Sequence, residues 1–257
     1  MIELPCTDPY TDRPSMNVSA IIPAAGLGTR MAAAGPTKAR KSTPSKQFTD
    51  LAGTPILIHT LRRFMSVPSI SRIYVALRRV EIDDFRTRLQ NEFEDVWRND
   101  PQLIEGGENR QHSVANALAA IHASSDDIVL VHDAVRPFVT QAIIHEVIAA
   151  AKRYGAAIAG LPAVDTVKQV DRTAEGALIT ATIPRERVVL AQTPQGFRYS
   201  VLKKAFDEAS TDGFVGTDEA SLVERSGHQV AVVMGALRNI KITTPSDLEL
   251  AEFFLNR

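Results

Sequence analysis

Short runs of apolar and β-branched residues alternate along this chain with longer segments in which apolar residues recur at helical spacing. The expected strands are residues 18–23, 72–77, 128–132, 156–161, 229–234 and 239–243. The expected helices are residues 55–66, 110–122, 141–154, 199–209, 217–226 and 245–255. Few architectures accommodate such an alternation, and it predicts an α/β fold with a mostly parallel sheet flanked by helices.

One region breaks the alternation. Residues 163–188 contain two short β-like stretches, TVKQV and ALITATI, joined by the polar turn DRTAEG. This pattern predicts a protruding β-hairpin arm, which could cover a site or a partner subunit, although an ordinary surface hairpin fits equally well. We expect a single domain over residues 17–257 that includes the arm, preceded by a mobile tail at residues 1–16.

Composition excludes several classes of protein. A formal net charge of −1 argues against a general nucleic-acid binder, which usually carries a strong basic excess. The single cysteine, Cys6, allows neither an internal disulfide nor a cysteine metal cluster, and it favours a reducing, cytoplasmic setting. Residues 1–16 hold three prolines and no apolar block, and no apolar run approaches the roughly 20 residues that span a bilayer, so no membrane association is expected.

A glycine-containing turn, PAAGLGTRM, follows the first expected strand. Gly26 and Gly28 allow backbone N–H groups to approach phosphate oxygens closely. The dinucleotide-binding fingerprint needs a third glycine where this chain has Met31, and the phosphate-loop pattern G-x-x-x-x-G-K-[ST] is absent. By itself the turn is weak evidence for a phosphate site.

A basic stretch continues from that turn with no acidic residue inside it. Its cations are Arg30, Lys38, Arg40, Lys41 and Lys46. A solvated basic loop is the ordinary interpretation of such a stretch. Its place after the end of a first strand also suits a triphosphate, because fixed positive charge stabilises a reacting phosphoryl group and its pyrophosphate leaving group.

Two further motifs follow expected strands. In EGGENRQHSV, Gly106 and Gly107 permit close backbone approach and Ser113 can donate a hydrogen bond from the first helical turn. In VHDAVRPF, Asp133 comes directly after a strongly apolar strand, where ligands and metals collect in open α/β sheets. A helix cap is the less favoured interpretation of Asp133, which instead suits Mg²⁺ bound together with a nucleoside triphosphate.

Taken in order, the motifs resemble the 2-C-methyl-D-erythritol 4-phosphate cytidylyltransferase family of the non-mevalonate isoprenoid pathway. The matching segments are PAAGLGTRM, KQF, GTPILIHTLRRF, GGENRQHSV, VHDAVRPF, DTVK, AQTPQGF, TDEASLVE and NIKITTPSDLELAE. The resemblance implies a Rossmann-like subunit that transfers CMP from CTP to a polyol phosphate and releases pyrophosphate, with Mg²⁺. It also implies a homodimer built through the arm.

The resemblance implies roles for individual residues. The residues implied to bind the nucleotide are Ala24, Ala25, Gly26, Gly28, Gly107, Glu108, Arg110, Ser113 and Ala134. Arg30 and Lys46 are implied to stabilise the transition state, and Asp133 to bind Mg²⁺ and contact the acceptor. Asp165, Thr166 and Arg185 are implied to contact the acceptor of the neighbouring subunit, while Lys241 positions it within the same chain.

Two departures from the family pattern leave questions open. The segment AAAGPTKARKSTPS lengthens the usual spacing before the lysine, so Lys38 or Lys41 could fill the phosphate site instead of Lys46. Glu108 stands where an aspartate is common. The alternatives for function are a ribitol-5-phosphate cytidylyltransferase and a non-catalytic nucleotide-binding protein; the missing third glycine disfavours an oxidoreductase.

Overall fold

The computed structural model describes residues 16–26, 45–174 and 176–256. Within them a seven-stranded sheet has the order β11-β7-β10-β6-β1-β4-β5. Its strands are β1 (Val18–Pro23), β4 (Ile70–Leu77), β5 (Gln102–Glu105), β6 (Ile128–Val131), β7 (Ala156–Pro162), β10 (Val189–Arg198) and β11 (Ala231–Met234). Neighbouring strands run parallel except where β10 pairs antiparallel with β6 and β7. The expected mostly parallel sheet is confirmed.

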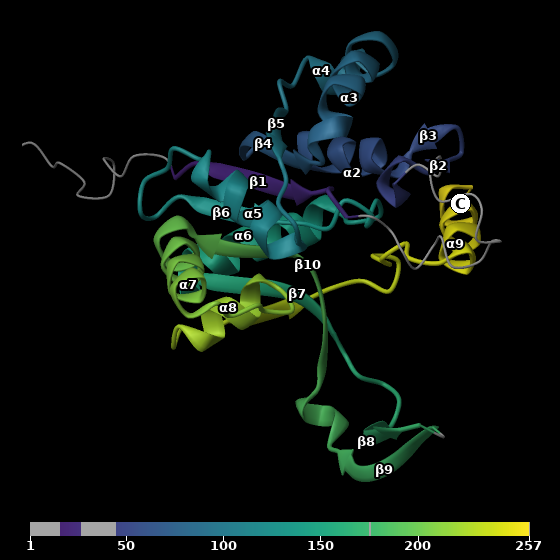
Figure 1. The fold of residues 1–257 in the computed structure, drawn as a ribbon, viewed down its shortest axis with the longest axis vertical. Coiled ribbons are helices and arrows are strands. Elements are labelled where there is room, and N and C mark those ends of the chain that lie inside the picture. The colour runs from purple at the N-terminus through teal and green to yellow at the C-terminus, as the bar shows by residue number, and fades with distance from the viewer. Residues whose placement is uncertain (1–15, 27–44, 175, 257) are drawn as a thin grey trace, which may run out of the picture.

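Helices cover both faces of this sheet (Figure 1). One face packs against α2 (Ile56–Met65), α3 (Arg79–Glu92) and α6 (Gln141–Tyr154), and the other against α5 (Arg110–Ala119), α7 (Tyr199–Asp212) and α8 (Glu219–Arg225). Along β1, Ala20 and Ile22 point into the first core and Ile21 into the second. Burial on both faces explains why the central strands are apolar throughout.

A smaller core lies beside the main body. The short hairpin of β2 (Asp50–Leu51) and β3 (Thr54–Pro55) packs near the last helix, α9 (Pro245–Leu255), with Leu51, Phe138 and Ile242 buried in one cluster. The remaining elements are the helix α4 (Glu94–Trp97) and two 3₁₀ turns, η1 (Lys46–Phe48) and η2 (Arg185–Arg187). None of the helices in the described part of the chain has the length and apolar character that a membrane crossing requires.

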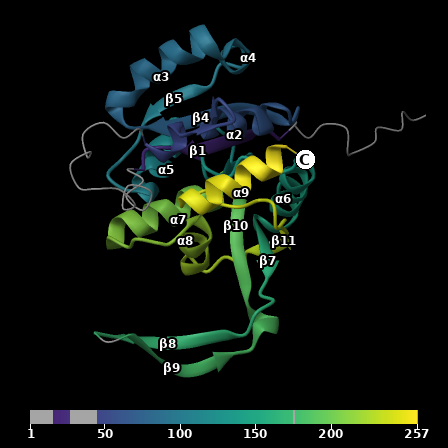
Figure 2. The same cartoon turned by 90° about the vertical axis from the view of Figure 1, so that its right-hand side faces the viewer.

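The predicted arm is present. The strands β8 (Val167–Thr173) and β9 (Gly176–Ile183) form an antiparallel hairpin that projects away from the sheet (Figures 1 and 2). Its apolar side chains face solvent in this single chain: Leu178 is 68% exposed and Ile179 65%. Apolar side chains gathered on a projecting element are typical of a surface that meets a partner.

The sequence patterns missed several elements and misassigned one. β5, α3 and β10 were not expected; β10 contains Pro194, Gly196 and several amides, which are uncommon in a central strand, and its pairing with β7 is irregular between Ala191 and Gln195. Conversely, residues 239–243 were expected to form a strand and do not. Ile242 donates one backbone hydrogen bond to the carbonyl of Val135, but the segment is otherwise irregular.

Candidate active site

A cavity of about 290 Å³ opens at the carboxyl ends of β1 and β6 and at the turn between β5 and α5. The sequence-predicted residues that line it are Ala24, Ala25, Gly26, Lys46, Gly107, Glu108, Arg110, Ser113, Asp133, Ala134 and Lys241. They come from five separate parts of the chain and meet because parallel strands end at one edge of the sheet. Gly28, Arg30, Lys38 and Lys41 lie outside the described residues.

Two glycine turns face each other across this cavity. A Cβ added at Gly106 would lie 2.5 Å from the Cβ of Ala25, and one at Gly107 would overlap His112, so both positions need glycine. A Cβ at Gly26 would meet no atom of the described residues within 4 Å. Gly106 lets the two turns pack closely, and Gly107 lets its own turn pack against His112. Among the described residues, Gly26 leaves room for a ligand beside the backbone.

Ser113 supports the second turn. Its Oγ accepts a hydrogen bond from the backbone N–H of Gly107 at 3.1 Å and donates one to the carbonyl of Asn109 at 2.8 Å. Asn109 in turn caps α5 by accepting from the backbone N–H of His112 at 2.8 Å. Ser113 therefore fixes the conformation of the turn at the cavity wall.

Asp133 is buried among cations. Its carboxylate lies 2.8 Å from Lys241 Nζ, 3.2 Å from Arg110 Nε and 3.3 Å from Arg136 Nε. Burial acts to raise the pKa of Asp133, but the attraction of Arg110, Lys241 and Arg136 outweighs it and holds that pKa well below its usual range. Asp133 is therefore ionised, and the cluster combines a fixed anion with positive charge on several sides.

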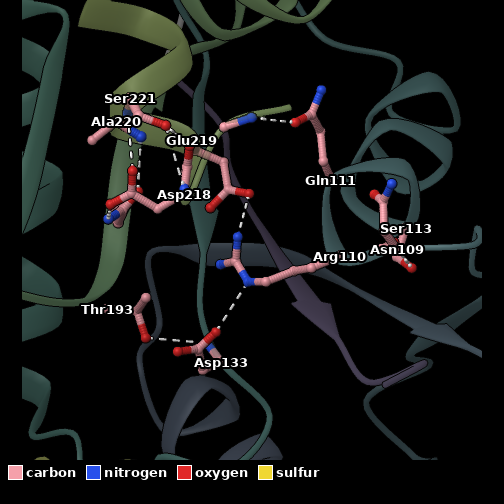
Figure 3. Close-up of polar contacts among 12 residues, drawn as sticks. Asn109, Arg110, Gln111, Ser113, Asp133, Thr193, Asp218, Glu219, Ala220 and Ser221 are labelled. Carbon is pink, nitrogen blue, oxygen red and sulfur yellow. Dashed lines mark hydrogen bonds and ion pairs between the residues drawn. The ribbon is translucent and has the colours of Figure 1, made fainter. Parts of the chain in front are cut away.

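Glu219 is a site residue that the sequence reasoning missed. Its Oε1 lies 2.6 Å from Nη1 of Arg110, and it is 1% exposed at the start of α8. Figure 3 shows Arg110 reaching between Asp133 and Glu219. Burial raises the pKa of Glu219, although the charge of Arg110 opposes that shift. For Arg110 burial acts to lower the pKa, but the carboxylates of Glu219 and Asp133 together raise it.

A fully buried histidine supports Asp133 from behind. Thr193 Oγ1 accepts from the backbone N–H of Asp133 at 3.1 Å and lies 3.0 Å from Nδ1 of His132. Nε2 of His132 lies 3.0 Å from the carbonyl of Arg136, which can only accept, so Nε2 carries the proton and Nδ1 accepts from Thr193. Mainly because of its burial, the pKa of His132 is lowered to about 4.

This histidine predicts a pH dependence of stability. The unfolded chain takes up a proton at His132 near its ordinary pKa of 6.5, whereas the folded chain resists until about 4, so stability is present above 6.5 and falls as pH drops toward 4. The loss from this group approaches about 3 kcal/mol. Urea midpoints measured across this range should decline less steeply for His132→Gln; equal slopes for the variant and the parent would contradict the assignment.

The arm residues do not join the cavity of their own chain. Asp165 and Thr166 precede β8, and Arg185 in η2 donates from Nη1 to the carbonyl of Val164 at 2.7 Å. None of the three is among the residues that line the described cavity, and the hairpin that they flank projects from the sheet (Figure 2). Within one chain the structure therefore leaves these three residues apart from the other predicted site residues.

A second cavity of about 280 Å³ adjoins the first. The two share Arg110, Asp133 and Lys241, and the second adds Arg136, Thr193, Thr217, Asp218 and several residues of β10 to its walls. One charged cluster thus faces two compartments. Such a layout suits a reaction between two bound molecules at the shared wall.

Glycine turns, a lysine and a buried acid at the carboxyl edge of a mostly parallel sheet are typical of an α/β protein that binds a nucleotide, and the comparisons place this chain among the nucleotidyltransferases. The chain belongs to the 2-C-methyl-D-erythritol 4-phosphate cytidylyltransferase family, whose model matches residues 18–257.

Individual relatives agree. A 2-C-methyl-D-erythritol 4-phosphate cytidylyltransferase from Acidobacterium capsulatum is 55% identical over 242 residues, which are 94% of this chain and 98% of the relative. The crystal structure of the Francisella tularensis protein of that name shares 36% identity at a TM-score of 0.75, covering 92% of this chain and 99% of that one. The crystal structure of the 4-diphosphocytidyl-2C-methyl-D-erythritol synthase from Anaerococcus prevotii shares 28% identity at a TM-score of 0.76. The match covers 95% of this chain and 100% of that one.

These comparisons confirm the family resemblance, the α/β fold and the assignment as a cytidylyltransferase. They favour this family over the ribitol-5-phosphate cytidylyltransferases and over a non-catalytic nucleotide-binding protein. The domain boundaries and the roles of individual residues stay predictions.

Proposed function

We propose that this chain transfers CMP from CTP to 2-C-methyl-D-erythritol 4-phosphate and releases pyrophosphate. The observation that carries the proposal is the shared wall of the two cavities, where Asp133 is held among Arg110, Arg136 and Lys241. One cavity has the glycine turns suited to a nucleotide, and the other has the cationic wall suited to an acceptor phosphate. The family to which the chain belongs supplies the identity of both substrates.

CTP is proposed to occupy the larger cavity. Its phosphates lie against the turn of Ala24, Ala25 and Gly26, which continues into Gly28, and its base and ribose face Gly107, Glu108, Arg110, Ser113 and Ala134. Support comes from the room that the described residues leave beside Gly26 and from the fixed Gly107 turn. Backbone N–H groups in such turns bind anions without the cost of ordering long side chains.

The reaction is proposed to be an in-line displacement. A phosphate oxygen of the acceptor attacks the α-phosphorus of CTP, the new phosphorus–oxygen bond forms, and the bond to the bridging oxygen breaks as pyrophosphate leaves. Lys46 and Arg30 stabilise the charge that develops on the transferred group. Lys46 is favoured over Lys38 and Lys41 because it lines the cavity and is followed by the matching Gln47 and Phe48.

Mg²⁺ is proposed as the cofactor. Among the described residues no group of three or more metal-ligating side chains occurs, so a metal held entirely by protein does not fit. Mg²⁺ fits, because it is commonly bound through one or two carboxylates together with phosphates and water, and Asp133 is an ionised carboxylate in the cavity wall. When bound, the ion would neutralise phosphate charge; Asp133 would hold it and also face the acceptor.

The acceptor is proposed to bind in the second cavity, with Lys241 and Arg136 facing its phosphate. Asp165, Thr166 and Arg185 reach the acceptor of a second copy of this chain in a homodimer formed through the arm. The apolar side chains exposed on β9 support this arrangement. A cytoplasmic location is part of the proposal and rests on the single cysteine.

The function is tested by measuring pyrophosphate release with each of the four nucleoside triphosphates and Mg²⁺, against methylerythritol phosphate, ribitol phosphate or no acceptor. We expect release from CTP with methylerythritol phosphate only. Specific activity should fall on dilution, because the arm of one subunit completes the site of the other. Equal rates with ATP and CTP, or no turnover with either acceptor, would refute the proposal.

A further inference from the structure

Lys46 stands on a very short element that the local sequence does not stabilise. η1 has three residues, and its N-cap, Ser45, makes no side-chain capping hydrogen bond. A single 3₁₀ turn lacks the repeated hydrogen bonds that hold a longer helix. The position of the Lys46 backbone must therefore depend on contacts with other parts of the chain.

On one side these contacts form a partly buried polar cluster. Ser45 is 4% exposed, and its Oγ donates to Oε1 of Glu81 at 2.8 Å while accepting from Nη2 of Arg78 at 2.7 Å. Arg78 and Glu81 also form an ion pair with each other at the start of α3. Hydrogen bonds to ionised partners are about twice as strong as neutral ones, so this cluster holds Ser45 firmly against α3.

On the other side, contacts fix the two residues after the lysine. Gln47 is 2% exposed and donates from Nε2 to the carbonyl of Ala24 at 2.5 Å. The ring of Phe48 packs on that of Phe85, with the ring centres 5.5 Å apart. Lys46 is thus held between α3 and the glycine turn, and it lines the cavity.

From this geometry we infer that Ser45, Arg78 and Glu81 are positioning residues for the reaction: they fix the backbone of Lys46 so that its ammonium group meets the transferring phosphoryl group. The inference rests on the proposed function. Lys46 acts there through charge that develops only in the transition state, so misplacing it lowers kcat and changes the two KM values little. A displacement of about 1 Å is enough to cost about 100-fold in rate.

The test compares kcat and both KM values for Ser45→Ala, Ser45→Thr and Glu81→Ala with those of the parent enzyme. Ser45→Ala and Glu81→Ala should lower kcat about 10- to 100-fold and leave each KM within about twofold, whereas Ser45→Thr, which keeps the hydroxyl, should retain most of the rate. Asp83→Ala is the matched control, because Asp83 is on the same helix and pairs with Arg86 at the exposed surface. It should behave as the parent does.

The same substitutions are then made together with Lys46→Ala. If the cluster acts through Lys46, adding Ser45→Ala should lower the residual rate by less than about twofold. The inference would be overturned by an unchanged kcat in Ser45→Ala, or by a rise of both KM values in parallel with a loss of melting temperature. It would also be overturned if adding Ser45→Ala to Lys46→Ala lowered the rate by as much as Ser45→Ala does alone. Failure of the proposed function is separate, since the parent enzyme would then show no cytidylyl transfer.

Discussion

Replacing Asp133 with asparagine is expected to lower turnover by about 1,000-fold, the upper end of what a single preorganised charge contributes. The carboxylate is the one proposed Mg²⁺ ligand in the cavity wall, and asparagine keeps its size but loses its charge. The same change removes the anion that Arg110, Arg136 and Lys241 surround. Steady-state pyrophosphate release and urea unfolding, measured on the same samples, check the two effects.

The two effects of that substitution can be separated. Adding Lys241→Met removes one uncompensated cation, so the double variant should recover stability relative to Asp133→Asn while staying inactive. Asp126→Asn is the control, because Asp126 is an exposed acid at the opposite end of β6 whose nearest cation, Arg198, is 4.0 Å away. Because Lys241→Met also removes a proposed acceptor contact, the single variant decides the role of Asp133. Turnover near that of the parent in folded Asp133→Asn would mean that Asp133 serves only to hold the fold together.

Most of the predicted site residues in the described part of the chain line one cavity, because several of them follow apolar strands. Asp133 comes directly after β6, and the turn of Gly26 comes after β1; the ends of parallel strands meet in space without further information. A basic stretch without acids drew attention to five cations in a nearly neutral chain, and the family resemblance favoured Lys46 among them because Gln47 and Phe48 follow it. For Asp133 and Gly26 a local pattern and a topological rule were enough to predict that they lie at one edge of the sheet.

Other parts of the site gave no such local signal. His132 lies one residue before Asp133 and reads as the end of a strand, and its role depends on Thr193, which is far away in sequence. β10 itself was missed because its polar residues and Pro194 resemble a loop. Its amides instead satisfy buried partners: Gln195 donates to Asp218 at 2.7 Å and accepts from the backbone N–H of Ala220 at 3.0 Å. Only the tertiary structure supplies such partners.

Glu219 illustrates the same limit. It follows Asp218, which caps α8 by accepting from the backbone N–H of Ser221 at 3.0 Å. An acid in the first turn of a helix ordinarily lies at the surface, where its charge interacts favourably with the helix dipole. Here the side chain is buried and paired with Arg110. The motif TDEASLVE holds a signal that could have found it, because two acids follow one another there. One acid is enough to cap the helix, so the second, Glu219, is available for another role.

Glu219→Ala is expected to lower the free energy of unfolding by about 2 kcal/mol, because it leaves the partly buried guanidinium of Arg110 without its shorter ion pair. Glu219→Gln keeps the volume and an oxygen that accepts from Arg110, and it removes the cost of burying a charge, so it should cost about 1 kcal/mol or less. Urea unfolding measures both. Glu224→Ala, an exposed acid on the same helix, is the control and should have no effect.

The glutamine variant also separates the two roles of Arg110. With Glu219 neutral, Arg110 loses one of the two charged partners that hold it in the cavity wall and keeps only Asp133, so its guanidinium is fixed less firmly beside the nucleotide. We therefore expect Glu219→Gln to fold well and yet to raise the KM for CTP by about 10-fold or more, the effect of losing roughly one charged hydrogen bond. A loss of stability as large as that of Glu219→Ala, with an unchanged KM, would instead assign the Glu219–Arg110 pair to the fold alone.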